Sequence, residues 1–284
     1  MTHHKPAHKA VALFVSLYLV LSATADDWKV EKILSDLQTA EGPVWDGGDK
    51  LFFTEIFAHK VHEYSLGNGK LTTIRTNSGG SNGMALDSQN RLLMCEMLGK
   101  RVTRMNPDGS SATLWKSDAQ KKGGPNDITI SRTGTAYFTM PSHQTVYRID
   151  TDDTIHPAIT QLPGINGVIL SHNEKTLYVT EYRKRRINAF PIDIETNEIG
   201  PRSHFASITT EGTKHGADGM AVDQHNQLYV ACLDGVWIYN ASGNQTGFIP
   251  LPNEKVTNCA FTDPQDKILY ITTQQGLFKA TRTQ

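Results

Sequence analysis

Six oxygen-bearing side chains recur along the chain, each at or just before the start of an apolar segment. Their spacings are 41, 44, 40, 52 and 40 residues, and the set is Glu41, Asn82, Asn126, Asn166, Asp218 and Asn258. Carboxylate and carboxamide oxygens are the ligands that Ca²⁺ and Mg²⁺ prefer. No cysteine or histidine shares these positions, which disfavours zinc or copper. Asn-Gly and Asp-Gly alone would be ordinary turn dipeptides. Glu41 does not fit that interpretation, and six matches in one register favour a site for one hard divalent cation.

The segments that must position these residues are short strands in a repeating order. Each polar residue leads into an apolar strand, a polar turn, a second apolar strand such as 92–94 or 228–230, and a third strand. A period of about 40 residues with several strands is typical of one β-propeller blade. The sequence therefore predicts an all-β, six-bladed β-propeller. In such a fold the first strand of each blade lines the central channel, so the six positions are expected to form a ring.

The last repeat unit is short, because residues 258–284 leave room for three strands only. Residues 28–37 precede the first repeat and can supply the missing outer strand. Pairing of this segment with the last blade would remove an exposed sheet edge. We therefore expect the N-terminal strand to close the last blade.

The first 25 residues have the features of a secretory signal peptide. Lys5 and Lys9 precede the apolar segment 10–21, and the small residues Ala23 and Ala25 provide a cleavage site. That apolar segment is short for a membrane span. We expect residues 1–25 to be removed, residues 26–284 to form the propeller, and the mature protein to be periplasmic or secreted with no membrane segment. An uncleaved anchor is the alternative.

The overall composition argues against several kinds of partner. The formal net charge is -1, so neither nucleic acid nor an anionic membrane surface is expected as a partner. The basic segment 183–186 is expected to be a solvated turn, since no second basic cluster accompanies it. Cys95, Cys232 and Cys259 lie in apolar strand-like segments and are expected to be unpaired core residues. One disulfide is the alternative in an oxidising compartment.

Motifs around the ring positions run in order through nearly all of residues 26–284. They include Glu41-Gly-Pro-Val-Trp, Ser81-Asn-Gly-Met, Arg91-Leu-Leu-Met-Cys-Glu96, Pro125-Asn-Asp-Ile, Asn166-Gly-Val, Asp218-Gly-Met-Ala-Val-Asp223 and Thr257-Asn-Cys-Ala-Phe261. As a set, they resemble the gluconolactonase, regucalcin and luciferin-regenerating-enzyme-like family of six-bladed propellers, and look most similar to bacterial gluconolactonases. The resemblance implies that the metal ligands are Glu41, Asn126, Asn166 and Asp218. Ca²⁺ is the implied cofactor, with Zn²⁺, Mg²⁺ or Mn²⁺ as substitutes in vitro. Asn82 and Asn258 would then be channel neighbours.

The resemblance also implies lactone hydrolysis. A metal in the channel would polarise the ring carbonyl and lower the pKa of a bound water, and Asp218 is assigned as the general base. In related organophosphate-cleaving propellers the equivalent Asp is a candidate nucleophile instead. Asn126 is also assigned to orienting the substrate. Asp127 has either a role in supporting the ligands or a plain structural one.

Three departures from the family pattern affect the expected substrate. Met97, Gly124 and Met140 stand where bacterial gluconolactonases usually carry polar side chains nearby. A hydrated sugar lactone needs several hydrogen bonds, so the substrate is either a less polar lactone or ester, or other polar groups replace the missing ones. The candidates for these substrate-binding groups are Glu96 and Arg101, with His143 and His215 as further options.

Two other functions stay open beside the lactonase. The same metal would also serve hydrolysis of an organophosphate (a phosphotriester) or an aryl ester. A non-catalytic propeller that binds a ligand beside a structural calcium is the third possibility, because a fold alone does not determine a function. The sequence thus predicts a small-molecule lactone or ester as partner and leaves the oligomeric state open.

Overall fold

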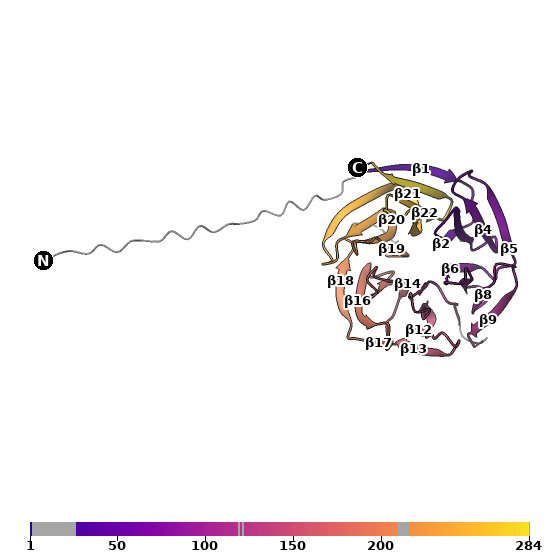
Figure 1. The fold of residues 1–284 in the computed structure, drawn as a ribbon, viewed down its shortest axis with the longest axis horizontal. Coiled ribbons are helices and arrows are strands. Elements are labelled where there is room, and N and C mark those ends of the chain that lie inside the picture. Colours follow the sequence, from indigo (N-terminus) through magenta and orange to yellow (C-terminus); the bar gives the residue numbers. More distant parts are fainter. Residues whose placement is uncertain (2–26, 119, 121, 210–215, 284) are drawn as a thin grey trace.

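The strand segments of this sequence pair in antiparallel order with their neighbours along the chain, because tight turns connect them. In this computed structural model the described residues are 1, 27–118, 120, 122–209 and 216–283, and the structural statements below concern these residues. Their sheets stand radially around a common centre, and the N-terminal strand lies at the rim of the last sheet (Figure 1). The predicted all-β propeller is confirmed by this arrangement.

Three sheets have four strands each, in chain order from the centre outward. The first consists of β2 (Ala40–Trp45), β3 (Lys50–Glu55), β4 (Lys60–Ser65) and β5 (Leu71–Thr76). The second consists of β6 (Ser81–Leu86), β7 (Leu92–Glu96), β8 (Arg101–Met105) and β9 (Ser111–Lys116). The third consists of β10 (Ile128–Ile130), β11 (Ala136–Met140), β12 (Thr145–Ile149) and β13 (Ile155–Ile159), with the 3-10 helix η2 (Pro141–His143) after β11.

The fourth sheet has an additional hairpin, which accounts for the 52-residue repeat spacing. It consists of β14 (Ile165–Leu170), β15 (Thr176–Glu181), β16 (Arg186–Asp193), β17 (Glu198–Ile199) and β18 (Ser203–Ser207). Both β17 and β18 pair with the long strand β16.

The fifth sheet joins the strands of two repeat units. Its order is β19 (Met220–Val222), β20 (Leu228–Tyr239), β21 (Gln245–Phe261), β22 (Ile268–Thr273), β23 (Leu277–Arg282) and β1 (Trp28–Leu34). Residues 245–255 of β21 pair with β20, and residues 256–261 pair with β22. Because β21 stays extended where a loop between blades was expected, the described chain has five hydrogen-bonded sheets. The prediction of six separate blades was therefore wrong.

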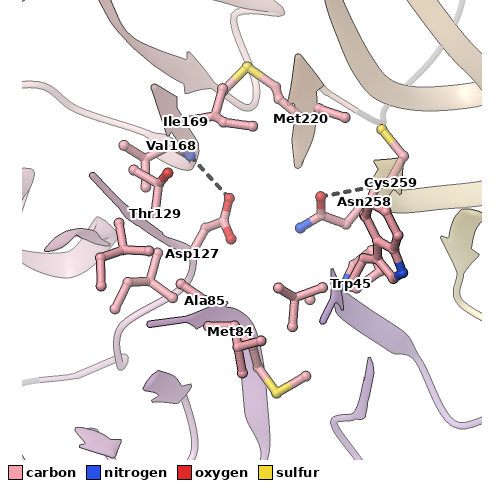
Figure 2. A pocket seen from close by; sticks show the side chains of 18 of the residues that line it. Trp45, Met84, Ala85, Asp127, Thr129, Val168, Ile169, Met220, Asn258 and Cys259 are labelled. Atoms are coloured by element: carbon pink, nitrogen blue, oxygen red, sulfur yellow. Dashed lines mark hydrogen bonds between the residues drawn. The ribbon is translucent and has the colours of Figure 1, made fainter. Parts of the chain in front are cut away.

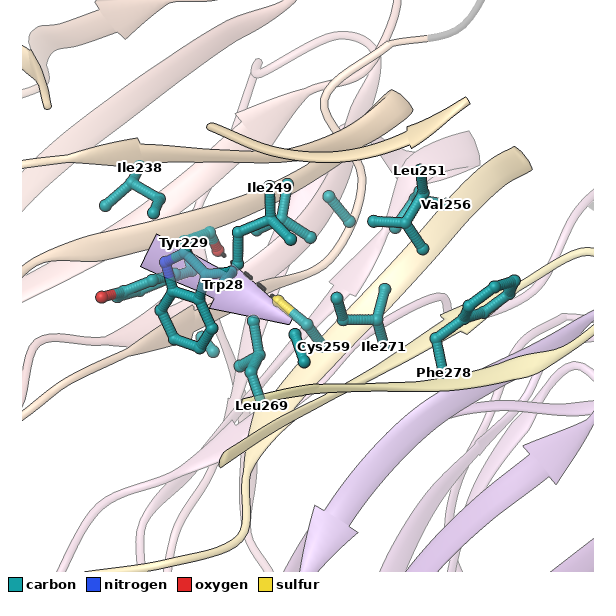
Figure 3. Close-up of a cluster of buried hydrophobic side chains, with 14 residues drawn as sticks. Trp28, Tyr229, Ile238, Ile249, Leu251, Val256, Cys259, Leu269, Ile271 and Phe278 are labelled. Atoms are coloured by element: carbon teal, nitrogen blue, oxygen red, sulfur yellow. Dashed lines mark hydrogen bonds between the residues drawn. The ribbon is translucent and has the colours of Figure 1, made fainter. Parts of the chain in front are cut away.

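The N-terminal strand closes this last sheet, as expected. β1 pairs antiparallel with β23, with Trp28 opposite Arg282. Trp28 lies in a buried cluster with Tyr229 and Ile271 that draws on several strands of the sheet (Figure 3). The guanidinium of Arg282 stacks over the Trp28 ring at 4.8 Å, a favourable cation–π geometry. Closure therefore depends on side-chain packing as well as on backbone pairing.

Replacing Trp28 by alanine is expected to lower the free energy of unfolding by about 3 to 5 kcal/mol, the usual cost of truncating a buried aromatic residue. Lys29, the next residue of the strand, is exposed, so Lys29→Ala should change it by about 0.5 kcal/mol or less. Urea unfolding followed by circular dichroism measures both. Equal effects of the two substitutions would mean that β1 does not lock the sheet.

Two further expectations concern the cysteines and the N-terminus. Cys95, Cys232 and Cys259 are all described and buried, and none of them forms a disulfide, so the prediction of core cysteines without a disulfide is confirmed. The predicted signal peptide, residues 1–25, lies almost wholly outside the described residues. In the part of the chain that is described, no helix has the length and apolar character needed to cross a membrane.

Candidate active site

The four predicted metal ligands lie on the innermost strands or just before them. Glu41 belongs to β2 and Asn166 to β14, whereas Asn126 and Asp218 each precede an inner strand by two residues. The pairing register shifts between Glu41 and Val44 in β2, and at the equivalent place in β14. Such irregularities re-aim a side chain that regular alternation would point elsewhere. The strand starts can therefore direct polar groups differently from the apolar residues that follow.

Contacts between neighbouring sheets hold the backbone of these positions. The Thr139 hydroxyl donates a hydrogen bond to the carbonyl oxygen of Asn166 at 2.5 Å, and the Thr180 hydroxyl donates one to that of Asp218 at 3.1 Å. A Cβ added to Gly167 would lie 2.4 Å from the Asp218 carbonyl oxygen. The glycine after a predicted ligand is thus required for close approach of the next sheet, which a turn-dipeptide interpretation does not explain.

Three carboxyl groups from different sheets interact in one desolvated region. Burial, followed by the charge of Asp127, raises the pKa of Glu41 to about 8. Burial raises the pKa of Asp127 itself to about 6. The pKa of Asp218 is raised well above its ordinary value, first by desolvation and then by the charges of Glu41 and Asp127. Because the three negative charges disfavour one another, the region favours either protons or a bound cation.

Hydrogen bonds orient two of these carboxylates. The Gly42 backbone N–H donates to Glu41 Oε2 at 2.7 Å, and the Asn258 amide donates to the same oxygen at 3.1 Å. The Asn166 side chain is hydrogen-bonded to the Asp218 carboxyl group. The structure thus brings Glu41, Asn166 and Asp218 into one interacting set. Asn258, which is far from Glu41 along the chain, donates a hydrogen bond to its carboxylate.

Asp127 and Asn258 line a cavity of about 330 Å³ along the channel, most of whose remaining lining is apolar. Figure 2 shows both side chains directed into this space, with the Val168 N–H donating to Asp127 Oδ2 at 3.1 Å. The charge of Asp127 acts on both Glu41 and Asp218. Of the two roles considered for Asp127, the geometry favours support of the ligand environment.

Asn126 and Asn166 share a second cavity, of about 350 Å³, which we call the mouth cavity. Its lining is Met97, Gly123, Gly124, Asn126, Pro141, Ser142, Gly164, Ile165, Asn166, Tyr182 and Arg183. Met97 and Gly124 are therefore part of it, as expected. Met140 is not, because its side chain is fully buried in the hydrophobic core beside Phe138. The expectation that Met140 lies near a substrate was wrong.

Glu96 and Arg101 contact each other rather than the mouth cavity. Glu96 is 0% exposed, and its carboxylate accepts hydrogen bonds from Arg75 at 2.6 Å, Arg101 at 2.6 Å and Thr103 at 2.8 Å. A carboxylate with all of these partners has no free oxygen directed at a ligand. Glu96 therefore lies in a buried ion-pair network and does not line the mouth cavity. Arg101, with 37% of its side chain exposed, is held by Glu96.

Glu96→Gln is expected to lower the free energy of unfolding by about 3 kcal/mol, since loss of one partner leaves buried charge uncompensated. Glu63 pairs with Lys50 on the surface at 2.9 Å, so Glu63→Gln is the matched control and should cost about 1 kcal/mol or less. Thermal and urea unfolding measure both variants. A rise in KM at unchanged stability would instead restore Glu96 as a substrate-binding residue.

The two histidines considered for substrate binding do not line the mouth cavity. His143 lines a neighbouring cavity of about 530 Å³ with Lys122, Ser142, Thr145 and Tyr147. Its Nδ1 lies 2.9 Å from the Tyr147 hydroxyl. His215 lies outside the described residues.

The donor set suits a hard divalent cation but not a soft one. Among the described residues, no group of three or more His, Cys, Asp or Glu side chains could hold a metal ion by itself. A cation here would therefore need the carboxamide oxygens of Asn126 and Asn166 together with the carboxylates of Glu41 and Asp218. Oxygen-only ligands of this kind fit Ca²⁺ or Mg²⁺. Burial and then neighbouring carboxylates raise the pKa values of Glu41 and Asp218, and a bound ion would neutralise that negative charge.

The sequence interpretation missed the threonines that connect the sheets. Thr54, Thr139 and Thr180 each follow an apolar residue near the end of a second strand and are all 0% exposed. Each donates its hydroxyl to the backbone carbonyl of the polar residue in the next repeat, Asn82 in the case of Thr54. The sequence signal for this role was a threonine at the same place in three repeats. Because threonine is common in β-strands, its recurrence alone did not indicate a contact between sheets.

Comparisons with known proteins agree with this geometry. A family model described as SMP-30/Gluconolactonase/LRE-like region matches residues 39–275. A pentonolactonase of Haloferax volcanii is 29% identical over 246 residues, covering 83% of this chain and 81% of the relative. A solved gluconolactonase from Xanthomonas campestris superposes with a TM-score of 0.80 at 26% identity, covering 98% of both chains. A calcium-binding regucalcin from Agrobacterium tumefaciens gives a TM-score of 0.78 at 18% identity, covering 91% of this chain and 94% of the other. Because the family model matches most of its length, residues 39–275, this chain belongs to the SMP-30/gluconolactonase/LRE-like family.

Proposed function

We propose that this protein is a lactone hydrolase that depends on a divalent cation, with Ca²⁺ as the preferred ion and Asp218 as the general base. The observation that carries the proposal is the environment of Asp218, whose desolvated carboxyl group interacts with Glu41 and is hydrogen-bonded to Asn166. Asn166 in turn lines the mouth cavity with Asn126. The similarity to a pentonolactonase and a gluconolactonase supports the reaction class.

The cation would be held by Glu41, Asn126, Asn166 and Asp218, and the regucalcin described as calcium-binding supports Ca²⁺ as the ion. When bound, it supplies positive charge that polarises a lactone carbonyl and lowers the pKa of a nearby water. Asp218 accepts a proton only in its ionised form, and burial followed by the charges of the carboxylates around it raises its pKa. Its function as a base therefore depends on positive charge in the site.

Ring opening would use Asp218 together with Asn126 and Asn166, the two proposed ligands that line the mouth cavity. The oxygen of a water molecule forms a bond to the lactone carbonyl carbon while Asp218 accepts a proton from that water. The ring C–O bond then breaks, and the proton passes from Asp218 to the leaving ring oxygen, giving a hydroxy acid. Asn126, which is half-buried in the same cavity, orients the substrate by hydrogen bonding.

A substrate panel with and without a chelator tests this proposal. The panel contains γ- and δ-lactones, aryl esters and phosphotriesters, each assayed with added Ca²⁺ and after removal of divalent ions. Turnover of lactones that stops with the chelator and returns with Ca²⁺ is the expected result. Turnover of phosphotriesters or aryl esters in preference to lactones would contradict the proposal and assign the protein to another class of hydrolase. A protein that binds Ca²⁺ but turns over none of the panel would contradict the proposal and favour a binding role.

A further inference from the structure

The mouth cavity carries positive charge, and its described lining contains no acidic side chain. Arg183 is the one charged residue in its described lining. The neighbouring cavity shares Ser142 with it and adds Lys122, again without a carboxylate. By contrast, the groove between the first two sheets is lined by Asp46, Glu63 and Asp108 as well as a lysine. The mouth therefore differs in charge from this groove.

Arg183 also differs from the basic residues beside it. Lys184, Arg186 and Arg202 all direct their charge at the buried carboxylate of Glu181, at distances of 2.8, 3.7 and 3.0 Å. Arg183 makes no ion pair with any described residue, and it is exposed. A solvated turn accounts for the basic segment as a whole, but not for one guanidinium that lines the cavity while its neighbours pair elsewhere.

Backbone hydrogen bonds hold the turn that carries Arg183. It follows Tyr182 in the turn between β15 and β16, and the Arg185 N–H closes that turn on the Tyr182 carbonyl oxygen at 3.1 Å. The Tyr182 N–H donates to the carbonyl oxygen of Gly164 at 2.8 Å, two residues before Asn166. The turn that carries Arg183 is thus tied directly to the strand that carries a proposed cation ligand.

The rest of the cavity offers few groups for a polyhydroxylated substrate. Met97, Pro141 and Ile165 are apolar, and beside the two asparagines and Arg183 the described lining adds polar side chains only at Ser142 and Tyr182. At Gly124 an added Cβ would lie 1.9 Å from the carbonyl oxygen of Met97, so no polar side chain can stand at that position. A ring with many hydroxyl groups would leave several of them without partners, which costs binding free energy. The lining favours a ring with an apolar body and one strongly polar substituent.

We propose that Arg183 is a specificity-determining residue that binds an anionic substituent, a carboxylate or a phosphate, on the lactone substrate. This inference rests on the proposed lactonase function. A guanidinium binds either oxyanion through two parallel hydrogen bonds. Lys122 in the neighbouring cavity adds a second positive charge for substituents that extend past Ser142. The lactone carbonyl would lie toward Asn126 and Asn166, and the anion toward the β15–β16 turn.

The test compares three lactones with the same ring, which carry a carboxylate, a phosphate or a neutral primary amide at the same carbon. The wild-type protein should show a higher kcat/KM for at least one anionic lactone than for the amide, and the better anion identifies the substituent. In Arg183→Ala the ratio of anionic to amide kcat/KM should fall by about 10- to 100-fold, with the loss mainly in KM. Arg183→Lys should recover part of it.

Lys184→Ala is the matched control, because it removes the same charge from the same turn at a residue that pairs with Glu181. Lys184→Ala should leave the ratio of anionic to amide kcat/KM unchanged. If this ratio falls as much as in Arg183→Ala, the effect is general electrostatic attraction and the inference is wrong. If all three lactones are hydrolysed equally, the inference is wrong and the proposed function stands. If none is hydrolysed, the inference is tested by binding instead. Calorimetry then measures the affinity for a cyclic ketone that has the same ring size and the same carboxylate but cannot be hydrolysed. Binding that Arg183→Ala abolishes supports the inference without turnover, and no binding overturns it.

Discussion

Replacing Asp218 by asparagine is expected to lower kcat for lactone hydrolysis by at least about 100-fold, the usual contribution of a general base. Asparagine has nearly the same shape but cannot accept the proton of the attacking water. The propeller should stay folded, because the substitution removes a desolvated carboxyl group whose ionised form is disfavoured by burial and by the charges of Glu41 and Asp127. Initial rates with Ca²⁺ measure the first effect, and circular dichroism with thermal unfolding measures the second.

Asp223→Asn in the same repeat is the control for this substitution. Asp223 is 0% exposed, and its carboxylate accepts backbone hydrogen bonds from His225 at 2.9 Å and Gln227 at 2.8 Å. We expect the Asp223→Asn variant to be less stable than the wild-type protein, with an unchanged kcat for the folded fraction. Asp218→Asn should show the opposite, a lower kcat at nearly unchanged stability. Chelator-sensitive hydrolysis at the wild-type rate in Asp218→Asn would remove Asp218 from the reaction. Transfer of ¹⁸O from labelled water into Asp218 during a single turnover would make it the nucleophile instead.

The repeat register could be predicted from sequence because one physical rule governs every unit. Five of the six polar positions, including Glu41 and Asn166, stand at the start of an innermost strand or two residues before it, whereas Asn258 lies inside the long strand β21. The number of separate sheets could not be predicted in the same way. Whether residues 250–256 form a loop or stay extended depends on pairing with two different strands, β20 and β22. A local pattern of apolar residues does not contain that information.

The site was predicted in its residue types but not in its surroundings. Position in a repeat indicates that Glu41 and Asp218 face a common axis, whereas the partners of a side chain depend on which strands become neighbours. Glu96 shows the difference: its place beside the mouth made it a substrate-binding candidate, but Arg75 from the preceding sheet takes one of its oxygens. Arg183 shows the converse, because its neighbours in the basic segment concealed that it lines the cavity.

Metal-free protein is expected to lose stability as the pH rises from about 5 to about 8, and Ca²⁺ is expected to restore it. Glu41 and Asp127 have pKa values raised to about 8 and about 6, and that of Asp218 is raised as well. Between their ordinary values and these, the folded state holds more protons than the unfolded state. Stability that depends on bound protons is therefore complete below the unfolded pKa values and disappears as pH rises through the folded ones.

Calcium should act in the opposite direction along the same pH scale, because it binds the ionised carboxylates for which protons compete. At pH 8, a concentration of about 100 times Kd should add about 2.7 kcal/mol, or roughly 5 to 10 °C in Tm for a chain of this size. At pH 5 the same concentration should shift Tm by far less. Glu41→Gln should flatten the pH dependence and remove most of the calcium effect, because it removes a carboxyl group that both has a raised pKa and is a proposed calcium ligand. A calcium shift of equal size at pH 5 and pH 8, unchanged in Glu41→Gln, would mean that the ion binds away from these carboxylates.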